Sequence, residues 1–208
     1  MKKIVLIFFY SLFWRNFLKL IIGLNYINRE ILFKSKQFIL IANHNSHMDT
    51  MAIMSSIPIK NISKTHPMAA LDFFGGNKIK KFLMRNLINA TLIDRNPELQ
   101  KEKPIQIMDD ILKKGRSLLL YPEGSRGISH NISNFKNGLA ILIQNNPNID
   151  VIPVYLKDIH KTLPKGSKLI VPFKCKIIFG QPIQFDSYDL NDILVKSQCS
   201  LIEIKENC

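Results

Sequence analysis

Two residues with acid–base chemistry, His44 and Asp49, lie in the segment NHNSHMD at 43–49, which follows the apolar run FILIA at 38–42. His44 stands where the run ends, and Asp49 falls in the first turn of a helix predicted at 46–56, so a chain reversal can bring the carboxylate to the imidazole. A carboxylate on one ring nitrogen fixes the tautomer and leaves the other nitrogen free to take a proton. The pair therefore predicts a general base. The same spacing also fits a capping box of Ser46 with Asp49, in which Asp49 would only satisfy the helix N-terminus.

A protein nucleophile to accompany this base is missing from the sequence. There is no GxSxG elbow, so the nucleophile is expected to belong to the substrate. His44 and His47 followed by Asp49 match no familiar zinc spacing, and we predict no metal site. The expected reaction is direct attack by a substrate hydroxyl without a covalent enzyme intermediate.

A second cluster, YPEGSRG at 121–127, leaves another apolar run into a loop. A glycine such as Gly124 lets the backbone approach a ligand closely or adopt a positive φ. Arg126 can grip a phosphate with two hydrogen bonds, and Ser125 and the loop amides add donors. Glu123 can hold Arg126 in place or accept a hydrogen bond from a substrate hydroxyl. We therefore expect these residues to bind substrate; the alternative is a plain turn with a weak surface ion pair.

The elements that must position these loops follow from hydrophobic patterning. Buried strands are predicted at 38–42, 91–93, 117–121, 151–156 and 176–179, and helices at 46–56, 78–87, 102–114, 138–144 and 189–206. Strands that alternate with helices indicate an α/β fold: a single domain at 31–208 with a central mixed sheet covered by helices. Pro153 costs its strand a ladder hydrogen bond, which predicts a sheet edge or a bulge at that point.

Residues 1–30 form a segment of different character. They are mostly apolar and aromatic, and Ser11, Arg15 and Lys19 make a narrow polar stripe at helical spacing. This pattern predicts a membrane-associating helix that lies in one leaflet while its arginine and lysine reach lipid phosphates. Packing against the domain's own core and a full tilted span are the alternatives.

The charge and composition of the chain limit the kinds of partner that it can bind. The 29 Lys+Arg against 16 Asp+Glu give a net charge of +13, which favours an anionic partner, and 46% hydrophobic residues exclude a disordered chain. A basic amphipathic segment at 78–85 suits an anionic bilayer, with a solvated helix face as the alternative. Arg95 ends a predicted strand and can supply a second phosphate contact, or else is simply exposed. The cysteines, Cys175, Cys199 and Cys208, have no metal or redox spacing, which fits a reducing cytosolic setting.

Taken in order, these clusters resemble the glycerolipid acyltransferases, the family of 1-acylglycerol-3-phosphate (lysophosphatidate) acyltransferases. The family motifs NHxxxxD, a strand ending in (D/N)R, (F/Y)PEGTRS, FKxG and VIPV correspond here to 43–49, 94–95, 121–127, 135–138 and 151–154. In the third motif Ser125 stands for threonine and Gly127 for serine. The resemblance covers residues 38–185, most of the chain.

The resemblance implies transfer of an acyl group from acyl-CoA or acyl-carrier protein to a lysophospholipid hydroxyl, with these donors as co-substrates and no cofactor. His44 would be the base and Asp49 its orienting partner, while Arg95, Glu123 and Arg126 would bind the phosphate and glycerol of the acceptor. The expected location is the cytoplasmic face of a membrane with an anionic surface.

One position departs from the family pattern. The second motif usually begins with glycine, and here that position is Asn89. Asparagine tolerates positive φ better than most residues, so the turn can survive. The change can equally mark a branch with another lysolipid acceptor.

The sequence disfavours two other classes of protein. A nucleic-acid-binding protein is disfavoured because the aromatics cluster in apolar runs instead of alternating with arginine, and no recognised binding pattern occurs. No nucleic-acid partner is therefore expected. A non-catalytic lipid-binding relative is disfavoured by the intact motif residues His44, Asp49 and Arg126.

Overall fold

The computed structural model describes residues 2–46, 48–71, 77–94, 103–125, 127, 131–162, 171 and 173–208. Its centre is a seven-stranded sheet in the order β1-β7-β6-β2-β5-β3-β4. The strands are β1 Asn25–Ile27, β2 Phe38–Ala42, β3 Thr65–Ala70, β4 Thr91–Ile93, β5 Ser117–Leu120, β6 Asp150–Lys157 and β7 Lys176–Phe179. The pair β6–β7 is antiparallel and the other pairs are parallel, so the predicted mixed sheet is confirmed.

Helices connect most of the strands. They are α1 Lys2–Ile7, the π-helical η1 Phe8–Trp14, α2 Arg15–Ile22, α3 Ile31–Lys34, α4 Asp49–Ser56, α5 Ile59–Ile62, α6 Lys78–Asn86, α7 Pro104–Lys113, α8 Asn137–Asn145, α9 Ile159–Thr162 and α10 Leu190–Glu206. All five predicted strands and all five predicted helices are present, with ends shifted by a few residues. The strands β1 and β3 and the short helices α3, α5 and α9 are additional.

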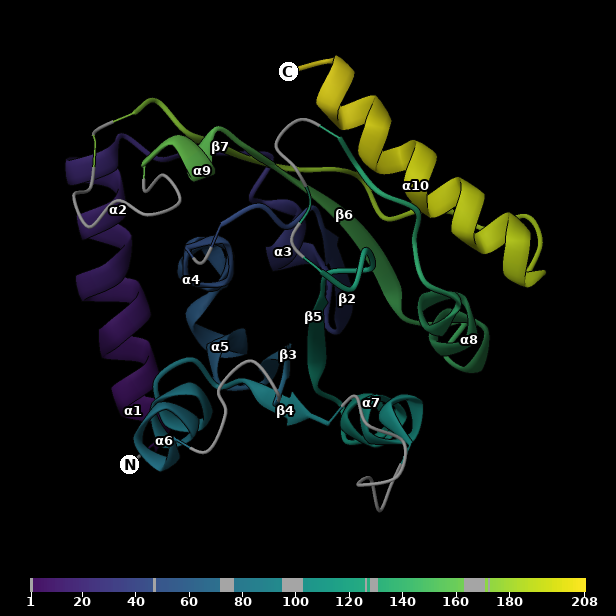
Figure 1. The fold of residues 1–208 in the computed structure, drawn as a ribbon, viewed down its shortest axis with the longest axis horizontal. Helices are drawn as coiled ribbons and strands as arrows, with labels where there is room; N and C mark the ends of the chain where they lie inside the picture. Colours follow the sequence, from purple (N-terminus) through teal and green to yellow (C-terminus); the bar gives the residue numbers. More distant parts are fainter. Residues whose placement is uncertain are drawn as a thin grey trace.

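Both faces of the sheet are covered, as Figure 1 shows. Alternate residues of β2 point to opposite sides, because successive side chains of a strand do so. Phe38 and Leu40 pack into a core shared with α4 and the N-terminal helix, whereas Ile39 and Ile41 pack into a core shared with α7, α8 and α10. Coverage of both faces explains why β2 is apolar throughout.

The prediction that Pro153 lies at an edge of the sheet is wrong. Strand β6 lies inside the sheet, between β7 and β2, and Pro153 pairs with Ile41. The Pro153 carbonyl accepts the N–H of Gly180 at 2.8 Å, immediately beyond the end of β7 at Phe179. The N–H and C=O of one residue point to the same side of a strand, so a backbone N–H at position 153 would also face β7. Because the pairing of β6 with β7 stops at Phe179, the N–H that proline lacks is not needed for that ladder. An interior proline is tolerated there for this reason.

The segments α1, η1 and α2 form one helix, Lys2–Ile22, along the domain (Figure 1). Leu6, Tyr10, Leu18 and Ile22 are fully buried on one face. The opposite face carries exposed apolar side chains, namely Ile4, Val5, Phe8, Leu12, Phe13, Leu20 and Ile21. By length and composition alone this helix could cross a membrane, with a mean hydropathy of 1.6, and it is the one such helix in the described part of the chain.

The polar stripe of this helix does not point where we expected. Arg15 turns inward, with Nε 2.6 Å from the Ser55 carbonyl and Nη2 3.2 Å from the Ile57 carbonyl, so the prediction that it reaches lipid phosphates is wrong. Lys19 is exposed. Within the expected segment 1–30, β1 also pairs with β7 and belongs to the sheet.

Candidate active site

The candidate site lies where two neighbouring parallel strands end. The strands β2 and β5 pair in register, Ile41 with Leu120, so the loops that leave their carboxyl ends lie side by side. The first loop carries His44 and leads into α4, and the second carries Glu123. In open α/β sheets this edge is where ligands bind. The sheet thus brings together the two clusters that the sequence separates.

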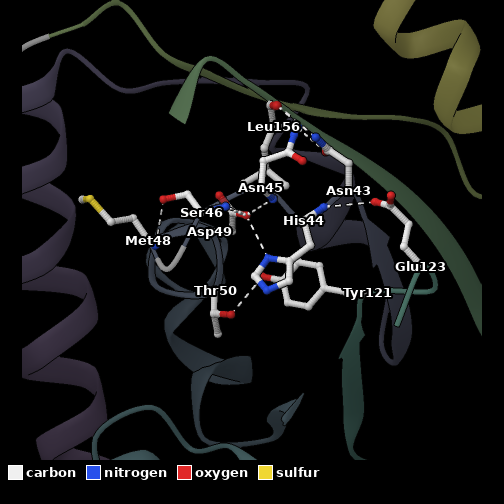
Figure 2. Close-up of polar contacts among 10 residues, drawn as sticks. All are labelled: Asn43, His44, Asn45, Ser46, Met48, Asp49, Thr50, Tyr121, Glu123 and Leu156. Carbon is white, nitrogen blue, oxygen red and sulfur yellow. Dashed lines mark hydrogen bonds and ion pairs between the residues drawn. The ribbon is translucent and has the colours of Figure 1, made fainter. Parts of the chain in front are cut away.

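His44 and Asp49 form a direct pair (Figure 2). The Nδ1 atom of His44 lies 2.9 Å from Oδ2 of Asp49. The His44 side chain is 21% exposed, whereas that of Asp49 is 1% exposed. The buried carboxylate therefore bonds Nδ1, and no described side chain bonds the other ring nitrogen, Nε2.

Asp49 also orders the loop that carries His44. Its Oδ2 accepts the backbone N–H of Asn45 at 2.8 Å and that of Ser46 at 2.7 Å. The Ser46 hydroxyl accepts the N–H of Met48 at 3.2 Å instead of that of Asp49, so the capping box is only half formed. The two interpretations of Asp49 are thus compatible: one carboxylate fixes both the loop and the imidazole.

The second loop holds the backbone of His44. The His44 N–H donates to Oε1 of Glu123 at 3.2 Å, and the His44 carbonyl accepts the N–H of Gly127 at 2.9 Å. The other Glu123 oxygen, Oε2, accepts the N–H of Ser133 at 2.9 Å, and Glu123 is 4% exposed. These partners differ from the substrate hydroxyl expected for Glu123 and favour a positioning role.

Tyr121 supports the imidazole from the side. Its ring stacks on that of His44 with centroids 4.0 Å apart and an interplanar angle of 19°, and its hydroxyl bonds Thr50 Oγ1 at 2.9 Å (Figure 2). Burial, and to a lesser extent the charge of Asp49, raise the pKa of Tyr121 well above its usual value, so the phenol stays neutral. Sequence reasoning missed this role, although an aromatic residue directly after the predicted strand was an available signal.

Asn43 has a second role that the sequence did not reveal. Its Oδ1 accepts the N–H of Leu156 at 2.8 Å, and its Nδ2 donates to the Leu156 carbonyl at 3.2 Å. The side chain thereby continues the β2–β6 ladder, which ends at Ala42 with Val154. The backbone of the next residue, His44, is then available to the Glu123 loop.

The glycines of the second loop fit its geometry. Gly124 has φ of 76°, which favours glycine. A Cβ on Gly127 would lie 3.1 Å from Glu123 Oε2 and 3.4 Å from Asn45 Oδ1. Ser125 is exposed at the same loop.

Two predicted phosphate ligands, Arg95 and Arg126, lie outside the described residues, as does His47. Strand β4, which precedes Arg95, runs parallel to β3, and β3 runs parallel to β5. The carboxyl end of β4 therefore points to the same edge of the sheet as the His44 loop. Among the described residues, no group of three or more His, Cys, Asp and Glu side chains could hold a metal ion.

Asn89, where the family pattern has glycine, is in the left-handed region with φ of 60°. Its side-chain Nδ2 donates to the carbonyls of Ser63 at 3.2 Å and Thr65 at 2.9 Å, and the residue is 2% exposed. The turn before β4 is thus preserved, as the tolerance of asparagine for positive φ predicts, and it gains two hydrogen bonds.

The sequence is similar to those of known acyltransferases. The family model described as Acyltransferase matches residues 23–157. A probable 1-acyl-sn-glycerol-3-phosphate acyltransferase of Mycoplasma pneumoniae is 26% identical over 171 residues, covering 76% of this chain and 62% of that protein. The protein of the same name from Mycoplasma genitalium is 26% identical over 180 residues, covering 80% of this chain and 65% of that protein. The match therefore spans slightly less than two thirds of each relative's length.

The fold also has a solved counterpart. The crystal structure of the 1-acyl-sn-glycerophosphate (LPA) acyltransferase PlsC from Thermotoga maritima superposes with a TM-score of 0.67. The likeness covers 88% of this chain and 71% of that chain at 19% identity. At this identity the comparison supports the fold.

Proposed function

The chain belongs to the acyltransferase family, and on this premise we propose that it transfers a fatty acyl group from acyl-CoA or acyl-carrier protein to the free hydroxyl of a lysophospholipid. The first candidate acceptor is 1-acyl-sn-glycerol-3-phosphate, the substrate class in the names of its relatives, which would give phosphatidate. The observation that carries the proposal is the 2.9 Å contact between His44 Nδ1 and Asp49 Oδ2, made by an imidazole side chain that remains 21% exposed.

The proposed reaction is a single displacement. Nε2 of His44 accepts the proton of the acceptor hydroxyl as its oxygen attacks the thioester carbonyl carbon. The tetrahedral intermediate collapses with cleavage of the C–S bond, and the imidazolium returns the proton to the departing thiolate. Asp49 stabilises the imidazolium in between, as in the His–Asp half of a hydrolase triad. General base assistance contributes roughly 10²- to 10⁴-fold in rate.

The surrounding residues serve this step by limiting motion of the base. Tyr121 restricts rotation of the imidazole by stacking, and Glu123 fixes the backbone of His44. In the described part of the chain, Asp49 is the one side chain that hydrogen-bonds the His44 ring. This arrangement supports the proposal of a base that acts on a substrate hydroxyl, since no serine or cysteine side chain among the described residues hydrogen-bonds the His44 ring.

We propose that arginine side chains bind the phosphate of the acceptor. A planar guanidinium forms two parallel hydrogen bonds to phosphate, which a lysine ammonium does not. We assign this role to Arg95 and Arg126, supported by the direction of β4 and by the position of the 121–127 loop beside His44. Gly124 and Ser125 are proposed to line the same part of the site.

Membrane association is proposed for the exposed apolar face of the N-terminal helix. Ile4, Phe8 and Leu20 are 72%, 62% and 80% exposed on it. Exposed apolar surface of this extent marks a site of contact with a membrane or a partner. Because Leu6, Tyr10, Leu18 and Ile22 on the opposite face are buried in the domain core, a bilayer crossing would require the helix to leave the domain. We therefore propose that it lies in the cytoplasmic leaflet.

Helix α6 extends the proposed membrane surface. It exposes Ile79, Phe82 and Leu83, and it carries the cationic residues Lys78, Lys80, Lys81 and Arg85. Apolar side chains flanked by cations suit a bilayer that contains anionic lipids.

The membrane proposal is tested by measuring binding to vesicles. The double variant Phe8→Ser with Leu20→Ser, on the N-terminal helix, should bind vesicles at least about tenfold more weakly than the wild type. Val195→Ser, an exposed apolar change on α10, should bind like the wild type.

The direct test of the activity is a substrate panel. The chain is incubated with acyl-CoA or acyl-carrier protein and a set of lysophospholipids, and both acylated lipid and free fatty acid are measured. The expected result is acylated lipid, lost at least about a hundredfold in His44→Ala. Absence of transfer to every acceptor, or unchanged transfer by His44→Ala, would overturn the proposal. Free fatty acid as the sole product would reassign the site to thioester hydrolysis.

A further inference from the structure

We infer that Arg15 positions the catalytic pair: by holding the C-terminal end of α4 it fixes the helix whose first residue is Asp49. Arg15 lies in the N-terminal helix and faces the protein. Its Nε donates to the Ser55 carbonyl at 2.6 Å and its Nη2 to the Ile57 carbonyl at 3.2 Å. This role rests on the proposed function of His44 and Asp49.

The end of α4 requires such a partner. The last carbonyls of a helix have no intrahelical N–H donor, and a cation beside them is favoured by the helix dipole. Arg29 supplies a further donor, with Nε 2.5 Å from the Ser56 carbonyl. Two guanidinium groups from different segments therefore close the same helix end. Of the two, only Arg15 belongs to the N-terminal helix.

Helix α4 can transmit this constraint to the site. It has eight residues, so its two ends are about 12 Å apart at the usual rise of a helix. Most of its side chains are buried, and η1 and α2 pack along it. A short helix packed in this way moves as a unit, so releasing its C-terminal end changes the position of Asp49 and, through it, the orientation of the His44 ring.

The proposal predicts a defined kinetic effect. Arg15→Ala should lower kcat about tenfold while the acceptor KM stays within about twofold, because a small displacement of a catalytic group slows chemistry more than binding. Arg15→Lys, which keeps the charge and can bond one carbonyl, should recover part of the loss. The matched control is Asn16→Ala. Asn16 is the exposed neighbour of Arg15, and its side chain bonds only the Leu12 carbonyl of its own helix among the described contacts.

A double-mutant cycle separates positioning from general damage. In an Asp49→Asn background, measured by single turnover with radiolabelled donor, Arg15→Ala should change the rate less than about twofold, because the residue through which Arg15 acts is already lost. An equal loss in both backgrounds would overturn the inference. So would a kcat of Arg15→Ala within about twofold of the wild type.

A spectroscopic readout is independent of activity. The low-field proton resonance of His44 Nδ1–H, assigned by its loss in His44→Gln, should shift or broaden in Arg15→Ala and Arg15→Lys but not in Asn16→Ala. An unchanged resonance in both Arg15 variants would overturn the inference. If the wild type transfers no acyl group, the proposed function fails, and this resonance still decides whether Arg15 positions the pair. If Arg15→Ala does not fold, Arg15→Lys carries the same comparison.

Discussion

The backbone N–H of His44 donates to the buried carboxylate of Glu123 at 3.2 Å, across a sequence separation of 79 residues. Glu123 therefore ties the residue proposed as the base to the loop that follows β5. With its second oxygen on the N–H of Ser133, the carboxylate joins three separate stretches of chain. A carboxylate is the one protein group of this size that accepts at both of its polar atoms.

The first prediction concerns this carboxylate. Glu123→Gln replaces one accepting oxygen by an NH2 group, which must face one of the two backbone N–H donors. We expect kcat to fall roughly 10- to 100-fold with the acceptor KM nearly unchanged, because the position of the base is disturbed. Steady-state kinetics over a range of acceptor concentrations measures both quantities.

The control for Glu123→Gln is Glu30→Gln, which removes an exposed acidic group. It should leave both constants near the wild-type values. A rise in acceptor KM with unchanged kcat in Glu123→Gln would instead assign Glu123 to acceptor binding.

The second prediction concerns the side-chain ladder of Asn43. Asn43→Asp keeps an acceptor for the Leu156 N–H but sets a carboxylate oxygen against the Leu156 carbonyl, now 3.2 Å from the amide nitrogen. The free energy of unfolding should fall by about 1–3 kcal/mol, as for a buried acceptor that loses its donor. Urea unfolding measures the change. Wild-type stability of Asn43→Asp would contradict the ladder role.

The third prediction concerns the turn at Asn89. Asn89→Ala loses two hydrogen bonds and keeps a Cβ in the left-handed region, whereas Asn89→Gly loses the same bonds and removes that Cβ with its strain. The alanine variant should therefore be less stable than the glycine variant by about 1 kcal/mol. Thermal and urea unfolding of both variants provide the comparison. If the glycine variant is the less stable of the two, backbone strain is not what selects the residue here.

The fourth prediction concerns His66 on β3. Burial, then the positive charges of Arg116 and Lys2, lower the pKa of His66 from 6.5 to about 4. Between these values the unfolded chain binds a proton that the folded chain does not, so stability is full above about pH 6.5 and decreases as the pH falls toward 4. The slope per proton is at most about 1.4 kcal/mol per pH unit.

The measurement for His66 is urea unfolding from pH 7 to pH 4. In His66→Gln, which does not titrate, the decrease in stability over this interval should be smaller than in the wild type. An identical decrease in both proteins would show that other groups cause it.

Much of the fold follows from local patterning. The runs at 38–42, 91–93 and 176–179 are strands with the predicted bounds. For 38–42 the reason is burial on both faces of the sheet, where every residue must be apolar. Strand β3 was missed, since its sequence THPMAA contains a proline and few β-branched residues. Strand β1 was missed because its three residues, of mixed polarity, are too few to show the alternation of apolar and polar residues that indicates a strand. Both segments become strands because their backbones hydrogen-bond to a neighbouring strand of the sheet.

Local sequence is enough to specify the chemical groups of the site and the contacts that span a few residues. His44 and Asp49 are five residues apart, across the loop that leads into α4, so their pairing follows from local geometry. The contacts of Glu123, Tyr121 and Asn43 around His44, and the inward direction of Arg15, arise from tertiary packing. These depend on which strands lie next to each other and in what register, and on which face of a helix is buried. Strand order and packing partners are set by burial summed over the whole domain, which no local spacing encodes.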